Sequence, residues 1–587
     1  MKLRSEIPEK YKWDIDLFKT QEEIENVIKS VEFLTEDVKK YYGKFNNPDM
    51  FFDYYFNNLE KFINLQKLYH YIGNSLSVDG ANTELKKLSE RVQIAIAKYD
   101  KAAYFVTPQI SKLNTNYLKS LLNDPRAKDI ENDIKDVIIG KKHKIDEKTS
   151  NVISMLNKSF SNSSSVYDIF TDMEQPYEDA IDSNGEKHPV TNSNYGELVS
   201  SKDRKLRETG FNSTMNSFGK FNQTFAELYI QNIKHEVDFA RLHKFNTKLE
   251  EELFNYIPRS VFDNNIKFVN KNIPLLQKFI KIFAKDTKID NFTYYDLYLD
   301  EQLNSEISIE EGQKIILEAL KPLGDEYLNM VKRKLTDKSI DYLPNKDKTS
   351  GAYCSGCFNA KTLILMNWLN NFDSVSTLIH EMGHCINNEY YNNTQPFYKA
   401  GISIFCAEIA STVNEILLNL YMQKTCKPED RKFYVKDFLN SVRTTIFRQT
   451  LFTEFELFAH EAIENEIPVT NEDFNAKYYE LNEKYYGDSC VLPENLKYEW
   501  SRIPHFYRDY YVFCYSTGLI TAISIARKIL NEENYNEKYI HFLKNGTNKK
   551  PIDILKEIDI DLTKKESFEN AFKFIKEQLE IYESLCK

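Results

Sequence analysis

Two histidines four residues apart carry the clearest chemical signal in this sequence of 587 residues. His380 and His384 enclose Glu381 in the pattern His-Glu-x-x-His. In a helix, residues four apart lie one turn above each other, so both imidazoles would face the same metal ion. Zinc favours such ligands and keeps a coordination position for water, and a neighbouring carboxylate can carry a proton. The pattern therefore predicts metal-assisted hydrolysis with Glu381 as the general base.

The residues around this pattern favour a buried helix. Apolar side chains recur along it at helical spacing, at positions Val375, Leu378, Met382 and Ile386. Asp373 or Ser374 can cap the amino-terminal end. Gly383 is a poor helix former, costing about 1 kcal/mol relative to Ala. Its presence inside the pattern predicts that another backbone packs closely against it.

A third metal ligand is expected downstream, because a catalytic zinc ion usually takes three protein ligands. Glu408 and Glu415 lie seven residues apart in an apolar segment, so both would lie on nearly the same face of a helix. Two buried carboxylates need a cation or hydrogen-bond donors nearby. We predict that Glu408 binds the metal and that Glu415 orients an imidazole. A solvent-facing pair of glutamates is the alternative.

Two other patterns are incomplete as metal sites. His460, Glu461 and Glu464 lack a second imidazole, and we interpret their segment as a core or groove-lining helix. Cys354 and Cys357 form one Cys-x-x-Cys motif without a second copy. We interpret these two cysteines as incidental, since a zinc knuckle would need both halves.

Residues 502–518 are unusually rich in aromatic side chains around His505. If the segment is helical, Tyr507, Tyr511 and Tyr515 share one face. Aromatic stripes usually belong to a core, yet tyrosines beside a histidine can also donate hydrogen bonds to a developing oxyanion. The spacing leaves both interpretations open.

The composition favours a mainly α-helical globular protein. With 17 Gly and 16 Pro, the sequence has too few turn formers for an architecture of many strands. Amphipathic helices are expected near both ends, with apolar positions at Ile24, Val27, Ile28, Val31, Leu34 and at Phe568, Phe572, Ile575, Leu579, Tyr582. The net charge of −11 argues against a nucleic-acid partner and against an anionic membrane surface.

Two segments interrupt the helical pattern. Residues 349–368 pair small residues with a short apolar run, which predicts a β-hairpin. A strand beside the helix of His380 and His384 could bind an extended peptide through its edge, and an ordinary buried hairpin is the alternative. Turn formers at residues 183–194 predict a boundary between an N-terminal helical region, 1–190, and a catalytic region, 191–587.

We expect a cytoplasmic protein. The first residues lack the apolar segment of a secretory signal, and we find no apolar run of about eighteen residues. All eight cysteines lie from Cys354 onward and lack the spacing of a secreted disulfide framework. Reduced thiols are therefore expected. The sequence leaves the oligomeric state open, and a homo-oligomer is compatible with it.

Together these segments resemble oligoendopeptidase F, a group within the zinc metallopeptidase family that also contains thimet oligopeptidase. The resemblance spans nearly the whole chain and rests on residues 7–14, residues 350–384 and the segment around Glu408. It implies one zinc ion held by His380, His384 and Glu408.

The same resemblance implies roles for other residues. Glu381 corresponds to the general base, and His505 with nearby tyrosines corresponds to groups that steady the tetrahedral intermediate. Among these tyrosines we select Tyr511 and then Tyr515. Gly518 departs from the pattern, because a third tyrosine would be expected there.

The implied fold is a mainly α-helical, zincin-like metallopeptidase with helical lobes around a deep groove and a small β-hairpin near the active site. Such a groove admits short, unstructured peptides, which implies a zinc-dependent endopeptidase. A non-catalytic zinc-containing peptide-binding or scaffold protein is the alternative, although its structural site would want a fourth ligand such as Cys385 or Cys406. A zinc aminopeptidase is disfavoured, since we find no acidic motif for a free amino terminus.

Overall fold

Helices make up most of this protein, as the computed structural model shows for residues 2–15, 17–146, 148–149, 152–153, 162–299, 303 and 306–587. The predicted mainly α-helical fold is confirmed. By contacts the chain divides into two compact units, each assembled from three segments. The first unit contains residues 1–144, 305–422 and 525–560, and the second contains residues 145–304, 423–524 and 561–587.

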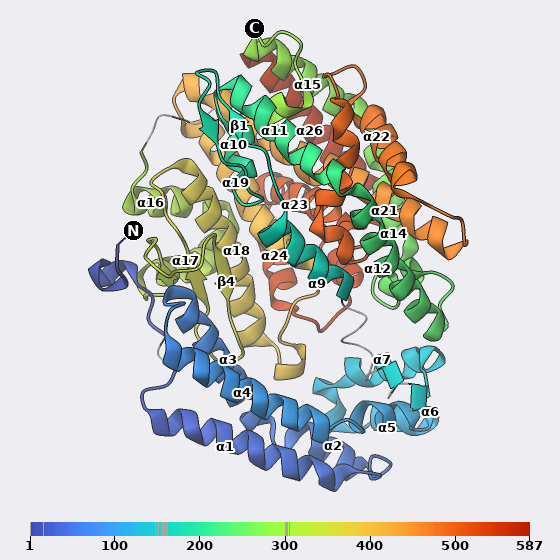
Figure 1. Ribbon diagram of the computed structural model, residues 1–587. Coiled ribbons are helices and arrows are strands. Elements are labelled where there is room, and N and C mark those ends of the chain that lie inside the picture. The colour runs from blue at the N-terminus through green and yellow to red at the C-terminus, as the bar shows by residue number, and fades with distance from the viewer. Residues whose placement is uncertain are drawn as a thin grey trace. The chain divides into compact units, whose positions relative to one another are not determined.

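The first unit begins with a layer of helices. Thr20 caps α1 by accepting a hydrogen bond from the backbone N–H of Glu23, and the predicted apolar stripe of α1 is buried except for the half-buried Val27. Helices α1, α3 and α4 lie side by side (Figure 1), which buries that stripe. The helices of this unit are α1 (Gln21–Asp37), α2 (Pro48–Phe56), α3 (Leu59–Val78), α4 (Thr83–Ala102), α5 (Val106–Lys112), α6 (Thr115–Leu121), α7 (Glu131–Gly140), α16 (Ile309–Ala319), α17 (Gly324–Thr336), α18 (Phe372–Thr394), α24 (Tyr535–Lys544) and α25 (Pro551–Glu557).

A small sheet in the first unit contains the predicted hairpin. Its strands are β3 (Ile340–Asp341), β4 (Tyr353–Ser355) and β5 (Leu363–Leu365), in the order β3-β5-β4. Strand β5 is parallel to β3 and antiparallel to β4, with Tyr353 opposite Leu365. The hairpin predicted within residues 349–368 is thus confirmed, and β4 is an edge strand that packs beside α18.

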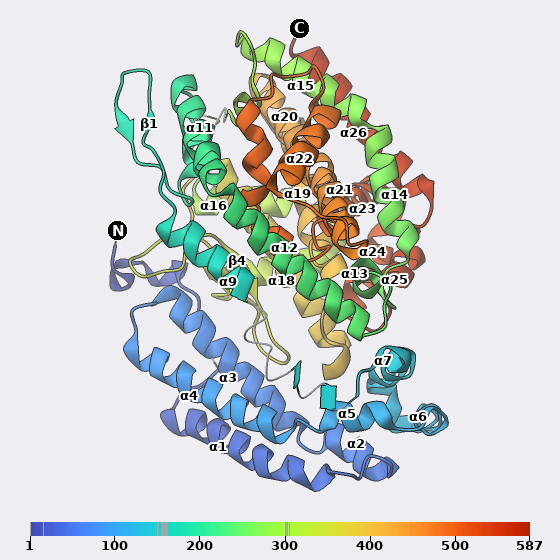
Figure 2. The same cartoon turned by 45° about the vertical axis from the view of Figure 1, so that its right-hand side comes forward.

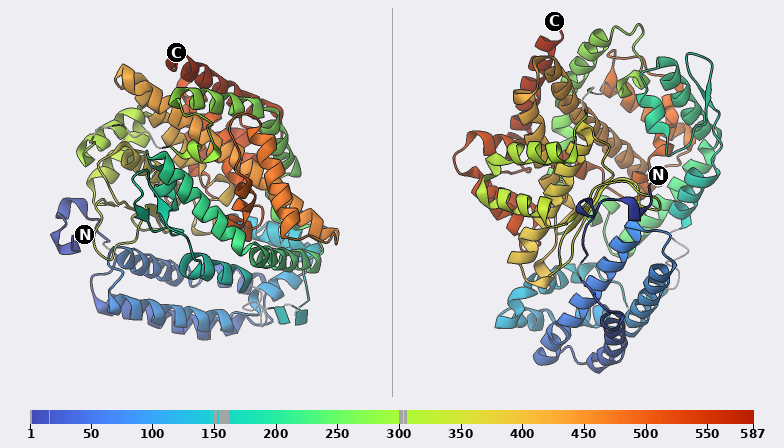
Figure 3. Two further views of the ribbon diagram at one scale, coloured as in Figure 1. Left: turned by 45° about the horizontal axis from the view of Figure 1, so that its top comes forward. Right: turned by 90° about the vertical axis from the view of Figure 1, so that its left-hand side faces the viewer.

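The second unit is also helical. Helices α12, α21 and α22 pack on one another (Figure 2), and the dark red α26 lies beside the light green α15 (Figure 3). All five predicted apolar positions of α26 are buried, which confirms the expected late helix. The elements of this unit are α9 (Asn162–Ile169), β1 (Ala180–Ile181), β2 (Lys187–His188), α10 (Tyr195–Ser200), α11 (Arg204–Lys220), α12 (Asn222–Leu242), α13 (Lys248–Leu253), α14 (Arg259–Lys271), α15 (Ile273–Thr287), α20 (Arg431–Val442), α21 (Arg448–Glu464), α22 (Asn471–Tyr486) and α26 (Lys565–Leu585).

Two helices contain a point where the chain passes between the units, namely α19 (Ile409–Thr425) and α23 (Phe513–Asn531). Among the described residues, every helix is too short or too polar to span a lipid bilayer.

Candidate active site

Helix α18 presents the two histidines, and the burial of its apolar stripe explains why it forms. The four predicted stripe residues, Val375 to Ile386, are all fully buried. The helix cap differs from the prediction, because Asn371 caps α18 by accepting a hydrogen bond of 2.9 Å from the N–H of Ser374. Asp373 and Ser374 lie inside the first turn, so the predicted cap was two to three residues too late.

Gly383 fixes the approach of α18 to the start of α19. A Cβ atom placed on Gly383 would lie 2.6 Å from the carbonyl oxygen of Ala410 and 2.6 Å from the Cα of Ser411. These are backbone atoms, which cannot move aside as a flexible side chain can. The predicted close packing of another backbone against Gly383 is therefore confirmed, and it brings Glu408 within reach of the histidines.

Three potential ligand atoms form a nearly equilateral triangle. The Nε2 atoms of His380 and His384 are 3.2 Å apart. Oε2 of Glu408 lies 3.4 Å from Nε2 of His380 and 3.3 Å from Nε2 of His384. Glu408 differs from the sequence interpretation in one respect: it immediately precedes α19 instead of lying within the helix. The structure nevertheless brings the three predicted ligands together.

This triangle fits a zinc ion. Zinc binds imidazole nitrogen and carboxylate oxygen at about 2.0–2.2 Å, so two ligands of a tetrahedral ion lie about 3.3–3.5 Å apart. The distances of 3.3 and 3.4 Å lie inside this range, and the distance of 3.2 Å lies 0.1 Å below it. Two imidazoles and a single carboxylate also suit zinc better than calcium or magnesium, which prefer oxygen ligands.

Polar contacts hold the triangle in place. Nδ1 of His380 lies 3.0 Å from Oε1 of Glu415, which leaves Nε2 free to face a metal. Ser411 donates a hydrogen bond of 3.1 Å to Oε2 of Glu408. Asn414 donates its side-chain N–H to the carbonyl oxygen of Ile379, at 3.1 Å, and so ties α19 to α18. The sequence analysis missed Asn414, although a polar residue between two glutamates of an apolar helix was a signal.

The two glutamates give the site a strongly negative potential. Burial disfavours the charged imidazole of His380, but hydrogen bonds with Glu408 and Glu415 outweigh it and raise the pKa of His380 to about 10. Burial alone would raise the pKa of Glu408, but hydrogen bonds with His380 and His384 outweigh it and hold this pKa well below its usual value. The site therefore favours positive charge at the imidazoles, which a cation can supply in place of protons.

Glu381 faces a different environment from the ligands. Its residue is only 8% exposed, and burial raises the pKa of its carboxyl group, although the neighbouring imidazoles of His380 and His384 oppose this. The backbone N–H of Cys354, on the edge strand β4, also opposes the rise to a smaller extent. A carboxyl group with a raised pKa binds a proton more readily than an ordinary one, which suits a group that takes up a proton and passes it on.

His505, Tyr511 and Tyr515 lie together in the second unit, whereas the metal ligands belong to the first. His505 lies in the short 3₁₀ helix η14 (Pro504–Tyr507), and only Tyr515 lies in α23. The ring centres are 6.0 Å apart for His505 and Tyr515, and 5.0 Å apart for Tyr511 and Tyr515. The continuous helix considered for residues 502–518 was wrong, because Tyr510 adopts a left-handed conformation with a φ of 51°.

Arg508 was missed by the sequence analysis and lies between these groups. Its guanidinium carbon is 4.1 Å from the ring centre of Tyr511. Burial and the positive charge of Arg508 together lower the pKa of His505, which keeps its imidazole neutral at pH 7. The available signal was the position of Arg508 in the sequence, midway between His505 and Tyr511.

The incomplete motifs occupy structural positions. His460 is fully buried in α21, in agreement with a core helix. None of the eight cysteines, all of which lie in the described part of the chain, forms a disulfide, and this includes Cys354 and Cys357.

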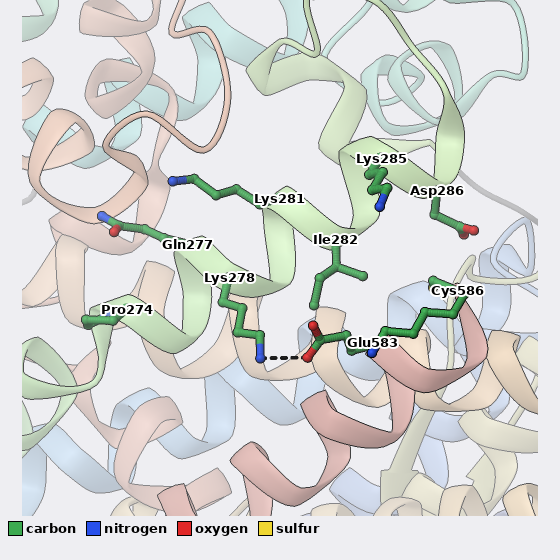
Figure 4. A pocket seen from close by; sticks show the side chains of 10 residues that line it. Pro274, Gln277, Lys278, Lys281, Ile282, Lys285, Asp286, Glu583 and Cys586 are labelled. Carbon is green, nitrogen blue, oxygen red and sulfur yellow. Dashed lines mark ion pairs between the residues drawn. The ribbon is translucent and has the colours of Figure 1, made fainter.

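The second unit also contains a cavity of about 400 Å³ (Figure 4). It lies between α15 and the end of α26, and none of the predicted site residues lines it. Lysines dominate its lining, but Lys278 is paired with Glu583 at 2.7 Å and Lys281 with Asp488 at 2.7 Å. These ion pairs neutralise much of its charge, and it offers no set of groups for catalysis.

Comparisons with known proteins agree with this geometry. The sequence pattern of peptidase family M3 matches residues 197–574. The chain is 31% identical to oligopeptidase PepF of Bacillus subtilis (strain 168), over 99% of this chain and 88% of the relative. It is 32% identical to an oligoendopeptidase F homolog of Borreliella burgdorferi, over 98% of each chain.

Solved structures give the same result. The crystal structure of a putative peptidase from Chlamydophila abortus covers 100% of both chains with a TM-score of 0.93 and 29% identity. That of oligoendopeptidase-F from Enterococcus faecium covers 96% of this chain and 99% of its own, with a TM-score of 0.75 and 28% identity.

Proposed function

The chain belongs to peptidase family M3, and from this premise we propose that it is a zinc-dependent endopeptidase that hydrolyses short, unstructured oligopeptides. The observation that carries the proposal is the triangle of ligand atoms, whose edges of 3.2–3.4 Å match those of a tetrahedral zinc site. His380, His384 and Glu408 would hold one zinc ion per chain. When bound, the ion supplies Lewis-acid activation of a water molecule and of the scissile carbonyl group.

Glu381 acts as the general base in this proposal. It takes a proton from the attacking water as the new C–O bond forms, and gives that proton to the nitrogen of the peptide bond as the C–N bond breaks. Its burial and its closeness to the two imidazoles, whose charges act on its carboxyl group, support the assignment.

His505, Tyr511 and Tyr515 stabilise the oxyanion of the tetrahedral intermediate in this proposal. Their rings form one cluster, and the neutral imidazole of His505 and the tyrosine hydroxyls are hydrogen-bond donors. Arg508 adds positive charge beside the same cluster, which favours a developing negative charge.

The edge strand β4 provides a place for the substrate backbone. It lies beside α18 and pairs with β5 on one side. An extended peptide can add to such an edge through main-chain hydrogen bonds, which tolerate many side chains. The relatives named as oligopeptidases and oligoendopeptidases support short peptides as the substrate class.

Peptide cleavage assays test this function. Quenched fluorogenic peptides of graded length should be cleaved at internal bonds, and a zinc chelator should abolish cleavage until zinc is restored. Mass spectrometry of the products identifies the bonds. Removal of single residues from the amino terminus would instead identify an aminopeptidase. Stoichiometric zinc without cleavage of any peptide would identify a non-catalytic peptide-binding or scaffold protein.

Three further assignments belong to the proposal. We place the protein in the cytoplasm, and the absence of disulfides among its eight cysteines supports this, since thiols stay reduced in reducing compartments. Its partners are peptide substrates, without a nucleic-acid or membrane partner, and self-association stays open. The division of the chain into an N-terminal helical region, 1–190, and a catalytic region, 191–587, remains a prediction.

A further inference from the structure

The loop that joins η14 to α23 contains an energetically unfavourable residue next to a proposed catalytic group. Tyr510 has a φ of 51°, in the left-handed region of backbone conformation that residues other than glycine rarely adopt. Tyr511, which follows directly, is proposed to stabilise the oxyanion. A bulky residue keeps such a conformation only where its surroundings impose it. The contacts of Tyr510 therefore determine how Tyr511 is presented.

Glu456 makes the contact that imposes this conformation. Its Oε1 atom accepts a hydrogen bond of 2.6 Å from the backbone N–H of Tyr510. Glu456 lies on α21 and is fully buried, so water cannot replace it as the acceptor. The ring of Tyr510 is also buried and packs on the imidazole of His460, one turn further along α21, with the ring centres 4.7 Å apart.

A buried polar cluster surrounds this hydrogen bond. Glu456, His460 and Asp509 each direct one polar atom toward the others, and all of these atoms lie within 4.8 Å of one another. Nε2 of His460 is 3.5 Å from Oδ1 of Asp509, without hydrogen-bond geometry, and Oε2 of Glu456 has no partner. Burial, and secondarily the charge of Asp509, raise the pKa of Glu456 well above its usual value. A neutral, protonated Glu456 avoids the repulsion that two ionised carboxylates would cause here.

Backbone hydrogen bonds transmit the position of Tyr510 to the proposed catalytic residues. The N–H of Arg508 donates to the carbonyl oxygen of His505 at 3.0 Å, and the N–H of Tyr511 donates to that of Arg508 at 3.3 Å. The N–H of Cys514 then donates to the carbonyl oxygen of Tyr511 at 3.1 Å, which connects the loop to α23. A rotation of the backbone at Tyr510 would disturb this whole series.

We propose that Glu456 is a positioning residue, which fixes the left-handed backbone of Tyr510 and thereby the orientation of Tyr511 and His505 for peptide hydrolysis. The inference rests on the proposed function, because it assumes that the His505–Tyr511 loop acts in the reaction. Glu456 acts only through the loop. The packing of Phe506 on Phe455, with ring centres 5.2 Å apart, keeps the loop on α21 independently of Glu456.

Substitution of Glu456 separates this role from general stability. Glu456→Met keeps the length of the side chain but removes the acceptor, so kcat should fall about 10- to 100-fold with KM and zinc content unchanged. Glu456→Gln retains a carbonyl oxygen for the N–H of Tyr510 and should restore at least half of the wild-type kcat. Glu454→Met is the matched control. Glu454 lies on the same helix and accepts hydrogen bonds from Asn270, Lys484 and Tyr485, outside the loop.

Amide hydrogen exchange measures the loop without reference to catalysis. Peptides covering residues 503–512 should be protected in the wild type and in Glu456→Gln, and should exchange faster in Glu456→Met. Rapid exchange of Tyr510 in the wild type would overturn the proposal even if Glu456→Met fails to fold. Unchanged protection in Glu456→Met, or an equal loss of kcat in Glu454→Met, would also overturn it.

Two further outcomes identify other errors. Faster exchange with unchanged kcat would show that the loop does not act in hydrolysis; Tyr511→Phe would then also leave kcat unchanged, and the assignment of Tyr511 to the reaction would fail. A second equivalent of metal in the wild type that Glu456→Met loses would assign the cluster to a cation, which overturns the positioning role. Retained metal, faster exchange and lower kcat together support it.

Discussion

Gly383 offers the sharpest test of how the protein builds its metal site. Its Gly383→Ala variant adds one methyl group at the point where α18 meets the start of α19. The new Cβ atom would lie 2.6 Å from the carbonyl oxygen of Ala410 and from the Cα of Ser411. Ordinary contacts of carbon with such atoms are about 3.4 Å or longer. The two backbones must therefore separate by roughly 0.8 Å locally.

The size of the effect follows from two opposing terms. Alanine is favoured over glycine inside a helix by about 1 kcal/mol. Overpacking typically costs about 1–3 kcal/mol, and a clash with backbone belongs at the upper end of this range because no side chain can rotate away. We therefore expect a net destabilisation of about 1–2 kcal/mol, together with a larger effect on the site.

The effect on the site is larger because Glu408 precedes the displaced backbone by only two residues. A shift of roughly 0.8 Å would lengthen its distances to His380 and His384 from 3.4 and 3.3 Å to about 4 Å. This exceeds the separation that a tetrahedral zinc ion can bridge. A misplacement of this size is expected to lower kcat/KM by about 100-fold, and zinc affinity should fall as well.

The assay combines zinc titration, peptide cleavage and thermal unfolding of the purified variant. Gly73→Ala is the matched control, because Gly73 lies inside the helix α3 of the same unit and a Cβ there would meet nothing within 4 Å. The control should gain up to about 1 kcal/mol and keep full activity. Wild-type zinc affinity and wild-type turnover in Gly383→Ala would refute the claim that backbone contact sets the ligand triangle.

Three other substitutions test separate parts of the account. Glu381→Gln should keep stoichiometric zinc by elemental analysis but lower kcat by about 10²- to 10⁴-fold, because the amide cannot accept the proton; near-normal turnover would remove Glu381 as the base. Tyr511→Phe should lower kcat more than it raises KM if the hydroxyl acts mainly in the transition state, and steady-state kinetics would reveal a change confined to KM as a binding role. Glu456→Gln tests how the free energy of unfolding depends on pH. Burial raises the pKa of Glu456 in the folded state, so above about pH 4.5 the folded protein still holds this proton after the unfolded chain has lost it. The free energy of unfolding of the wild type therefore falls as pH rises above about 4.5. The melting temperature of the variant relative to the wild type should therefore rise as pH rises above about 4.5, and a difference that stays constant with pH would contradict this.

Local spacing in the sequence predicted the helix that carries His380 and His384 well. The four-residue separation of His380 and His384, and the apolar stripe beside them, depend only on the geometry of one helix. Gly383 added information of longer range, since a helix retains an unfavourable residue where close packing demands it. The β-hairpin before α18 was likewise predictable, because its two strands are close in sequence.

Features that depend on distant contacts were not predictable. The helix considered as one possibility through Tyr507, Tyr511 and Tyr515 is interrupted at Tyr510, whose backbone N–H is held by Glu456 on α21. The cap of α18 was missed for a local reason, because several neighbouring polar side chains could have accepted hydrogen bonds from the free N–H groups and Asn371 is the one that does. Each unit also combines three separated segments of the chain, which no local pattern reveals.

The proposed ligand His380 and the proposed general base Glu381 have different neighbours around α18. Successive residues of α18 point about 100° apart, so Glu381 cannot face the same direction as His380. The imidazole of His380 meets Glu415 on α19, whereas the carboxyl group of Glu381 meets the N–H of Cys354 on β4. Changes at the α18–α19 contact should therefore act first on zinc affinity, and changes at β4 should act first on proton transfer. Because the charges of His380, His384 and Glu408 also act on the carboxyl group of Glu381, the effects of the two kinds of change on the free energy of activation should depart from additivity.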